Sequence, residues 1–173
     1  DISPFTINGY VVTIKGIDTT NAEGQTVKGK SQKVYILDKK IFEQAINSTV
    51  KSFIPEAEYE AFANNTQNNI EDVGEKITSI YIQNKITIKK QNIPVNKTIY
   101  MDTATLSQYL LFGTTEKQKT YQVKEGDTIE DVSFDNQVST EEFLIANPEF
   151  TSASSLLYPG QEVTIGILKP QVN

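Results

Sequence analysis

The chain has 173 residues, a formal net charge of −6 at pH 7 and a hydrophobic content of 38%. This composition fits a globular protein of one large or two small domains. It has no His and no Cys, which excludes a thiol nucleophile, an imidazole base and histidine-ligated zinc within this chain. It also has no Trp, and all 16 basic residues are Lys. No apolar run approaches eighteen residues, so we expect no membrane insertion.

The net charge is unevenly distributed. Residues 1–118 carry thirteen Lys and thirteen Asp plus Glu, whereas residues 119–173 carry three and nine. Because nucleic acids and anionic membranes are recognised through positive charge, the acidic last third argues against both as partners. The simpler alternative is that this charge only keeps a small domain soluble.

The first part of the chain alternates strand and helix patterns. Residues 10–17 and 33–38 are short β-branched runs, joined by a polar segment that predicts a hairpin or a long mobile connection. Residues 39–54 have apolar side chains at helical spacing, with Asp38 placed to cap. A second helix is expected over 55–65 because Pro55 fits its first position, followed by an Asn-rich loop.

The next elements complete a predicted α+β domain over residues 1–118. Residues 75–94 alternate, which predicts one long bent strand or two strands with a break at Gln83 and Asn84. A helix over 101–113 has Asp102 as its N-cap and Gly113 as its stop. Nothing in this region has recognisable chemistry, since neighbouring carboxylates at helical or loop spacing usually form a solvated face. The polar segment 114–120 indicates a domain boundary.

The last part of the chain has the order strand, helix, helix, strand. A strand over 121–123 runs into a turn at Gly126, and either Asp127 or Thr128 can cap the next helix. Ser139 or Thr140 can cap a second helix that ends before Pro148. "EVTIGI" then supplies the second strand, and an antiparallel pair with both helices on one face is the economical packing.

These residues closely resemble the lysin motif, or LysM domain, of cell-wall proteins. The resemblance rests on the aromatic-led strand at Tyr121, the "GDT" turn, the "ANP" helix end and the terminal "LLYPGQEVTI". It divides the chain into an accessory domain over 1–118, a LysM domain over 119–168 and a tail or linker over 169–173. The expected fold class is α+β, with an N-terminal α+β domain followed by a small βααβ domain.

The resemblance implies binding of N-acetylglucosamine-containing glycans, chiefly peptidoglycan or chitin, in a shallow groove between two loops. Small loops shaped by Gly and Pro expose backbone N–H and C=O groups, which suit a neutral acetamido sugar. Carried across residue by residue, the resemblance gives one glycan-binding wall made of Gly126, Asp127, Thr128 and Ile129. It gives the other wall as Asn147, Pro148, Leu157, Tyr158, Pro159 and Gly160. It implies no cofactor and no metal.

The upstream region also resembles the accessory region of clostridial-type, Gram-positive wall metallopeptidases. Their zinc ligands are His and Asp, and this chain has no His, so a catalytic domain would lie outside it. We therefore expect a noncatalytic, extracellular wall-targeting fragment of a larger peptidoglycan hydrolase. The alternatives are a structural or spore-envelope protein localised by its LysM domain, and a carboxylate-only glycosidase, which needs two carboxyls roughly 5 to 9.5 Å apart. The sequence does not indicate an oligomeric state.

Overall fold

The structure is a computed structural model that describes residues 5–53 and 82–172. These residues form two compact units, each described here by itself. The first unit contains residues 5–46, 82–115 and 168–172, and the second contains 47–53 and 116–167. Within the described ranges, no helix is long and apolar enough to cross a membrane.

The first unit is built on a four-stranded sheet with the order β5-β1-β4-β6. Strand β1 pairs antiparallel with both β4 and β5, and β4 pairs parallel with β6. The four strands are β1 (Thr6–Ile14), β4 (Gln32–Ile36), β5 (Ile86–Pro94) and β6 (Ile99–Tyr100). β1 begins and ends earlier than the predicted 10–17 strand, and its first residues, Thr6 to Gly9, pair with the end of β5.

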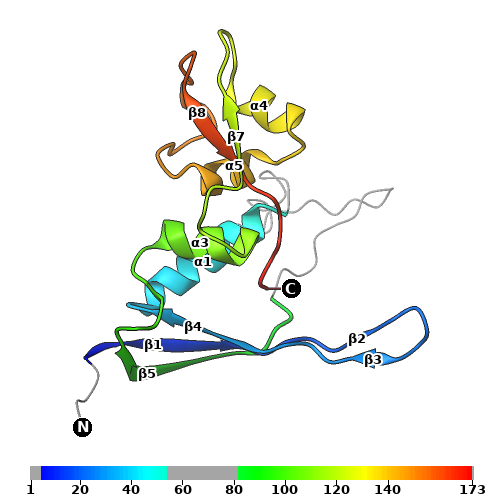
Figure 1. The fold of residues 1–173 in the computed structure, drawn as a ribbon, viewed down its shortest axis with the longest axis vertical. Coiled ribbons are helices and arrows are strands. Elements are labelled where there is room, and N and C mark those ends of the chain that lie inside the picture. Colours follow the sequence, from blue (N-terminus) through cyan, green and yellow to red (C-terminus); the bar gives the residue numbers. More distant parts are fainter. Residues whose placement is uncertain (1–4, 54–81, 173) are drawn as a thin grey trace, which may run out of the picture. The chain divides into compact units, whose positions relative to one another are not determined.

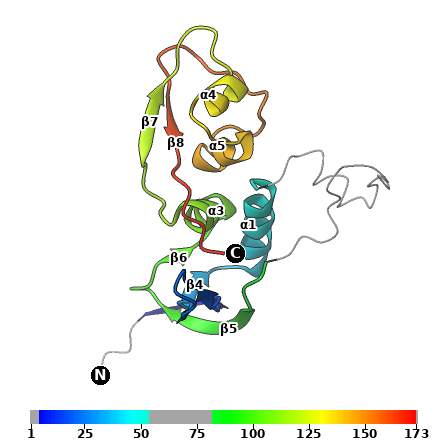
Figure 2. The same cartoon turned by 90° about the vertical axis from the view of Figure 1, so that its right-hand side faces the viewer.

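Two helices lie on the same side of this sheet (Figures 1 and 2). They are α1 (Lys39–Lys51) and α3 (Thr103–Phe112). Alternate residues of the strands, among them Val12, Val34 and Ile36, pack against Phe42 and Leu110 in one apolar core. The side chains at the intervening strand positions therefore face the side of the sheet that α1 and α3 do not cover.

Both predicted helix caps of this unit are confirmed. The Asp38 carboxylate accepts from the backbone N–H of Lys40 at 3.0 Å. Asp102 accepts from the backbone N–H of Thr105 at 2.8 Å. Gly113 ends α3 with φ 73°, a left-handed conformation, and its N–H donates to the Tyr109 carbonyl. The predicted helix over 55–65, the Asn-rich loop and residues 75–81 lie outside the described residues.

The last residues of the chain return to the first unit instead of forming the expected tail or linker over 169–173. Val172 is 5% exposed and belongs to the core of this unit. The backbone N–H of Lys169 donates to the Leu111 carbonyl at 2.9 Å, and that of Gln171 to the Leu110 carbonyl at 2.7 Å. The chain thus leaves the first unit after residue 115 and rejoins it at residue 168.

A two-stranded extension, β2 (Thr19–Thr20) with β3 (Thr26–Val27), grows from the ends of β1 and β4. It fulfils the hairpin alternative for the segment between the first two strands. At its base, Gly16 and Gly29 cross so closely that a Cβ on Gly29 would lie 2.3 Å from the Ile17 nitrogen. Only glycine allows the two backbones to approach in this way.

The second unit has the predicted βααβ order. Strands β7 (Lys119–Gln122) and β8 (Glu162–Ile165) pair antiparallel, and helices α4 (Ile129–Asp135) and α5 (Thr140–Ala146) lie between them in sequence. Val123, Val132, Phe143 and Val163 belong to its separate apolar core. The fold class of the described residues is therefore α+β, as the sequence predicts.

Candidate functional site

Two tight turns of similar construction stand at one end of the β7-β8 pair (Figure 1). In the first, the Asp127 N–H donates to the Lys124 carbonyl at 3.1 Å; in the second, the Gln161 N–H donates to the Tyr158 carbonyl at 3.0 Å. The third residue of each turn is a glycine with positive φ, 85° at Gly126 and 84° at Gly160. A type II turn requires this conformation there, which explains glycine at both positions.

The two turns are joined at their base by the backbone of Val123. Its N–H donates to the Gln161 carbonyl at 2.8 Å, and its carbonyl accepts from the Gly160 N–H at 2.7 Å. These bonds continue the β7-β8 ladder beyond its last assigned pair, Gln122 with Glu162. The structure therefore brings together the two loops that the sequence predicts as the walls of one groove.

Asp127 is turned toward its own loop. Its Oδ2 accepts from the Lys124 backbone N–H at 2.8 Å and from the Tyr121 hydroxyl at 2.7 Å. These two bonds hold the pKa of Asp127 below its ordinary value of 3.8. The hydrogen bond to Asp127 also raises the pKa of the Tyr121 hydroxyl. This carboxylate therefore fixes the first turn to β7, and its Oδ2 already accepts two hydrogen bonds from its own loop and strand.

The two residues after Asp127 have different surroundings. Thr128 is exposed and is the N-cap of α4, where its hydroxyl accepts from the Asp131 N–H at 3.1 Å. Of the two predicted caps, Thr128 is the one the structure shows. Ile129 is 0% exposed and packs in the core of the unit. Its side chain cannot meet a ligand at the surface, so a contact from Ile129 would have to use the backbone.

Asn147 is also buried, at 2% exposure. Its Nδ2 donates to the carbonyls of Phe143 at 2.9 Å and Thr164 at 2.8 Å, and its Oδ1 accepts from the Thr164 N–H at 2.7 Å. The carboxamide thus pairs with both backbone groups of Thr164, as a neighbouring strand would, and ties the end of α5 to β8. Pro148, the next residue, is exposed.

The second wall presents its residues unequally. Tyr158 is 66% exposed, and Pro159 and Gly160 beside it are exposed as well. Leu157 is half-buried and packs against the apolar core. Of the ten predicted site residues, six are therefore open to a ligand at the surface, namely Gly126, Thr128, Pro148, Tyr158, Pro159 and Gly160.

Three residues that shape this site were not among the predicted site residues. Tyr121 holds Asp127, Val123 joins the two turns, and the Gln161 side chain accepts from the Tyr158 N–H at 3.2 Å. Each is a supporting residue, and the role of Val123 depends on the pairing of β7 with β8. The sequence offers one signal for Gln161, its position directly after the Pro-Gly turn.

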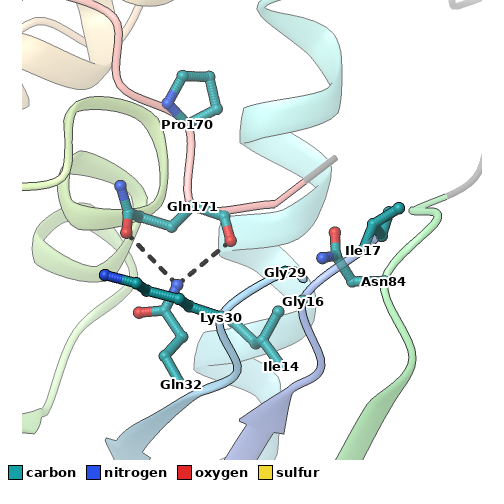
Figure 3. A pocket seen from close by; sticks show the side chains of 9 residues that line it. All are labelled: Ile14, Gly16, Ile17, Gly29, Lys30, Gln32, Asn84, Pro170 and Gln171. Atoms are coloured by element: carbon teal, nitrogen blue, oxygen red, sulfur yellow. Dashed lines mark hydrogen bonds between the residues drawn. The ribbon is translucent and has the colours of Figure 1, made fainter. Parts of the chain in front are cut away.

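The first unit has a separate cavity of about 230 Å³ between the base of the β2-β3 extension and the C-terminal segment (Figure 3). Three of its polar side chains, those of Gln32, Asn84 and Gln171, bond within the unit. Gln32 Nε2 donates to the carbonyl and the side-chain oxygen of Gln171 at 3.3 and 3.4 Å, and Gln32 Oε1 accepts from the Tyr109 hydroxyl. Asn84 Nδ2 donates to the Lys15 carbonyl at 3.0 Å. These bonds identify the cavity as the seam where the C-terminal segment is held.

Comparison with known protein families matches residues 121–166 to the LysM domain. The match starts in β7 and ends just after β8, so it covers the βααβ unit and both turns. No curated protein and no solved structure gives a match. Residues 121–166 are therefore a LysM domain, which indicates binding of peptidoglycan or a related N-acetylglucosamine-containing glycan and an association with the cell surface.

Proposed function

We propose that this chain is a noncatalytic, extracellular targeting fragment of a larger peptidoglycan hydrolase. Its LysM domain, residues 121–166, holds the parent protein on peptidoglycan. Weak binding by one such domain is useful because tethering raises the local concentration of whatever is fused to it. Bond cleavage belongs to another domain of the parent protein.

The observation that carries the proposal is the joined pair of turns within the LysM domain. Val123 fixes the Gly126 turn and the Gly160 turn to each other by two backbone hydrogen bonds. Apart from its two chain neighbours, neither glycine has an atom of the described residues within 4 Å of the place a Cβ would occupy, so a ligand can approach both turns. A ligand can therefore reach the backbone of both loops at once.

The chemistry of the exposed groups suits a neutral acetamido sugar. Backbone N–H and C=O groups at the turns can bond the acetamide and hydroxyl groups, while Tyr158 and Pro159 offer flat apolar surface to a sugar ring. Asp127, the acidic residue among the predicted site residues, is bonded into its own loop. We therefore expect binding that depends little on salt.

The noncatalytic part of the proposal is supported by composition. A zinc peptidase of the kind named above uses His ligands, and the chain has none. In the described part of the chain, no three His, Cys, Asp or Glu residues are grouped so that they could hold a metal ion. The full reading frame would distinguish a hydrolase from a structural or spore-envelope protein.

The test is a pull-down of the intact chain on purified insoluble peptidoglycan, with and without competing chito-oligosaccharide. We expect competitor-sensitive binding that Tyr158→Ala weakens about five- to tenfold, the loss of roughly one aromatic contact. Phe134→Ala is the matched control, because Phe134 is 83% exposed in the same domain and lies outside the two turns. Equal binding by both variants and the unaltered chain would refute the groove, and no binding by any of them would refute the function.

A further inference from the structure

The side of the four-stranded sheet away from α1 and α3 has a distinctive composition. None of its strands, β1, β4, β5 and β6, contains an Asp or a Glu. The residues of β1 that face this side alternate with the core residues Val12 and Ile14 and include Val11. Val11 is flanked by Tyr35 on β4 and by Lys89 on β5.

Three lysines surround Tyr35 on this side. Lys33 lies two residues before Tyr35 on the same strand, and so on the same side of the sheet. Lys89 lies across Val11, about 10 Å away by the spacing of neighbouring strands. The Lys97 ammonium stands 5.9 Å from the centre of the Tyr35 ring. We call Lys33, Tyr35, Lys89 and Lys97 the lysine face.

The lysines of this face are exposed, and no carboxylate among the described residues forms an ion pair with them. Lys33, Lys89 and Lys97 are all exposed. The ion pairs that join Lys28 to Asp18 and Lys117 to Glu162 do not involve the lysine face. Unpaired like charges held together on one surface attract a ligand that carries several negative charges.

The charge of the two units strengthens the contrast. Residues 5–46, 82–115 and 168–172 carry eleven Lys and five Asp plus Glu, a formal charge of +6. The described residues of the second unit, 47–53 and 116–167, carry four and ten, a formal charge of −6. The near-neutral total over residues 1–118 conceals this positive unit, because residues 54–81 contribute six acidic residues and one Lys. A polyanion would therefore be repelled by the LysM domain and attracted by the first unit.

We infer that the lysine face is a second binding surface, which takes an anionic polysaccharide. Its three ammonium groups pair with carboxylate or phosphate groups along the polymer, and the Tyr35 ring lies where a sugar ring can stack between them. A sheet face matches an extended chain, and two weak sites on one polypeptide gain avidity. The choice of a polysaccharide over another polyanion rests on the proposed function, which places the chain on cell-wall glycan.

The test uses the intact chain and polygalacturonate oligosaccharides, which carry one carboxylate per ring and no N-acetylglucosamine. Their fully methyl-esterified form is the uncharged probe with the same rings. We expect binding of the charged probe only, weakening as salt rises. The double variant K33Q/K89Q should bind about tenfold more weakly. K40Q/K90Q, with the same change in charge at residues outside the lysine face, should bind as the unaltered chain does.

Three further measurements separate the alternatives. Tyr35→Leu keeps apolar bulk on the strand and should weaken binding of polygalacturonate but not of polyglutamate, which has no sugar ring. Equal losses in K33Q/K89Q and K40Q/K90Q, or tighter binding of polyglutamate or duplex DNA than of polygalacturonate, would overturn the inference. Chito-oligosaccharide binding should be the same in all these variants, so a failure of the lysine face is distinguishable from a failure of the LysM groove.

Discussion

Replacement of Asn147 by Ala should destabilise the LysM domain strongly. The buried carboxamide makes three hydrogen bonds, and two of them satisfy the N–H and C=O of Thr164. Each net bond contributes about 0.5–1.5 kcal/mol to stability, and a buried group left unpaired adds to the loss. We therefore expect the free energy of unfolding of this domain to fall by about 2–4 kcal/mol.

Amide hydrogen exchange at Thr164 is the direct assay, because it reports this domain even if the first unit unfolds separately. The Thr164 N–H bonds to Asn147, so it should be protected in the unaltered chain and exchange much faster in Asn147→Ala. Asn136→Ala is the matched control, since Asn136 Nδ2 makes one bond, to the Val132 carbonyl at 2.8 Å. A loss below about 0.5 kcal/mol, or unchanged exchange at Thr164, would refute the argument that Asn147 substitutes for a neighbouring strand.

Four other substitutions test three separate features of the two units. Burial raises the pKa of Glu142 above its ordinary value of 4.5, so the stability that this side chain contributes is present below that value and is lost as pH rises through the folded pKa. Glu142→Gln should flatten the dependence of stability on pH and stabilise the domain at pH 7. Thermal unfolding between pH 4 and 8 measures both effects. Val172→Ala should cost the first unit about 2 kcal/mol in denaturant unfolding, whereas a loss near zero would mean that the C-terminal segment is not part of its core. Gly160→Ala should lower the stability of its domain by about 1 kcal/mol, because the new side chain suffers only from the positive φ of the backbone. Gly29→Ala should cost more, because its Cβ would lie within 2.5 Å of backbone atoms of Gly16 and Ile17. Similar melting temperatures for these two variants would contradict the close crossing of the backbones.

Local sequence signals predicted the caps and turns well. Asp102, Gly113, Thr128 and Ser139 act within a few residues of themselves, so their roles can be inferred from the adjoining sequence. The two alternatives left open at each LysM helix start were decided by which side chain reaches the third N–H of the helix. The structure shows Thr128 and Ser139 in that position.

Roles that depend on distant partners were not predictable in this way. "ANP" indicates a helix end, but only the placement of α5 beside β8 shows that Asn147 bonds to Thr164. Likewise, residues 169–173 were expected to form a tail or linker after the last strand, whereas Gln171 bonds to Gln32 across 139 residues of sequence. The lysine face was hidden for the same reason, because strand pairing brings together lysines that lie far apart in the chain.

The return of the C-terminal segment also sets an order of events during synthesis. The LysM domain closes through contacts that are near in sequence, such as the Tyr121 hydroxyl with Asp127 six residues away. The first unit, although most of it is made earlier, lacks Val172 and the Gln171 bonds until the residues that follow the LysM domain have been made. At a synthesis rate of about 5–20 residues per second, the core of the first unit remains incomplete for several seconds while the LysM domain is made. The domain that begins later in the chain is therefore the one that can finish folding first.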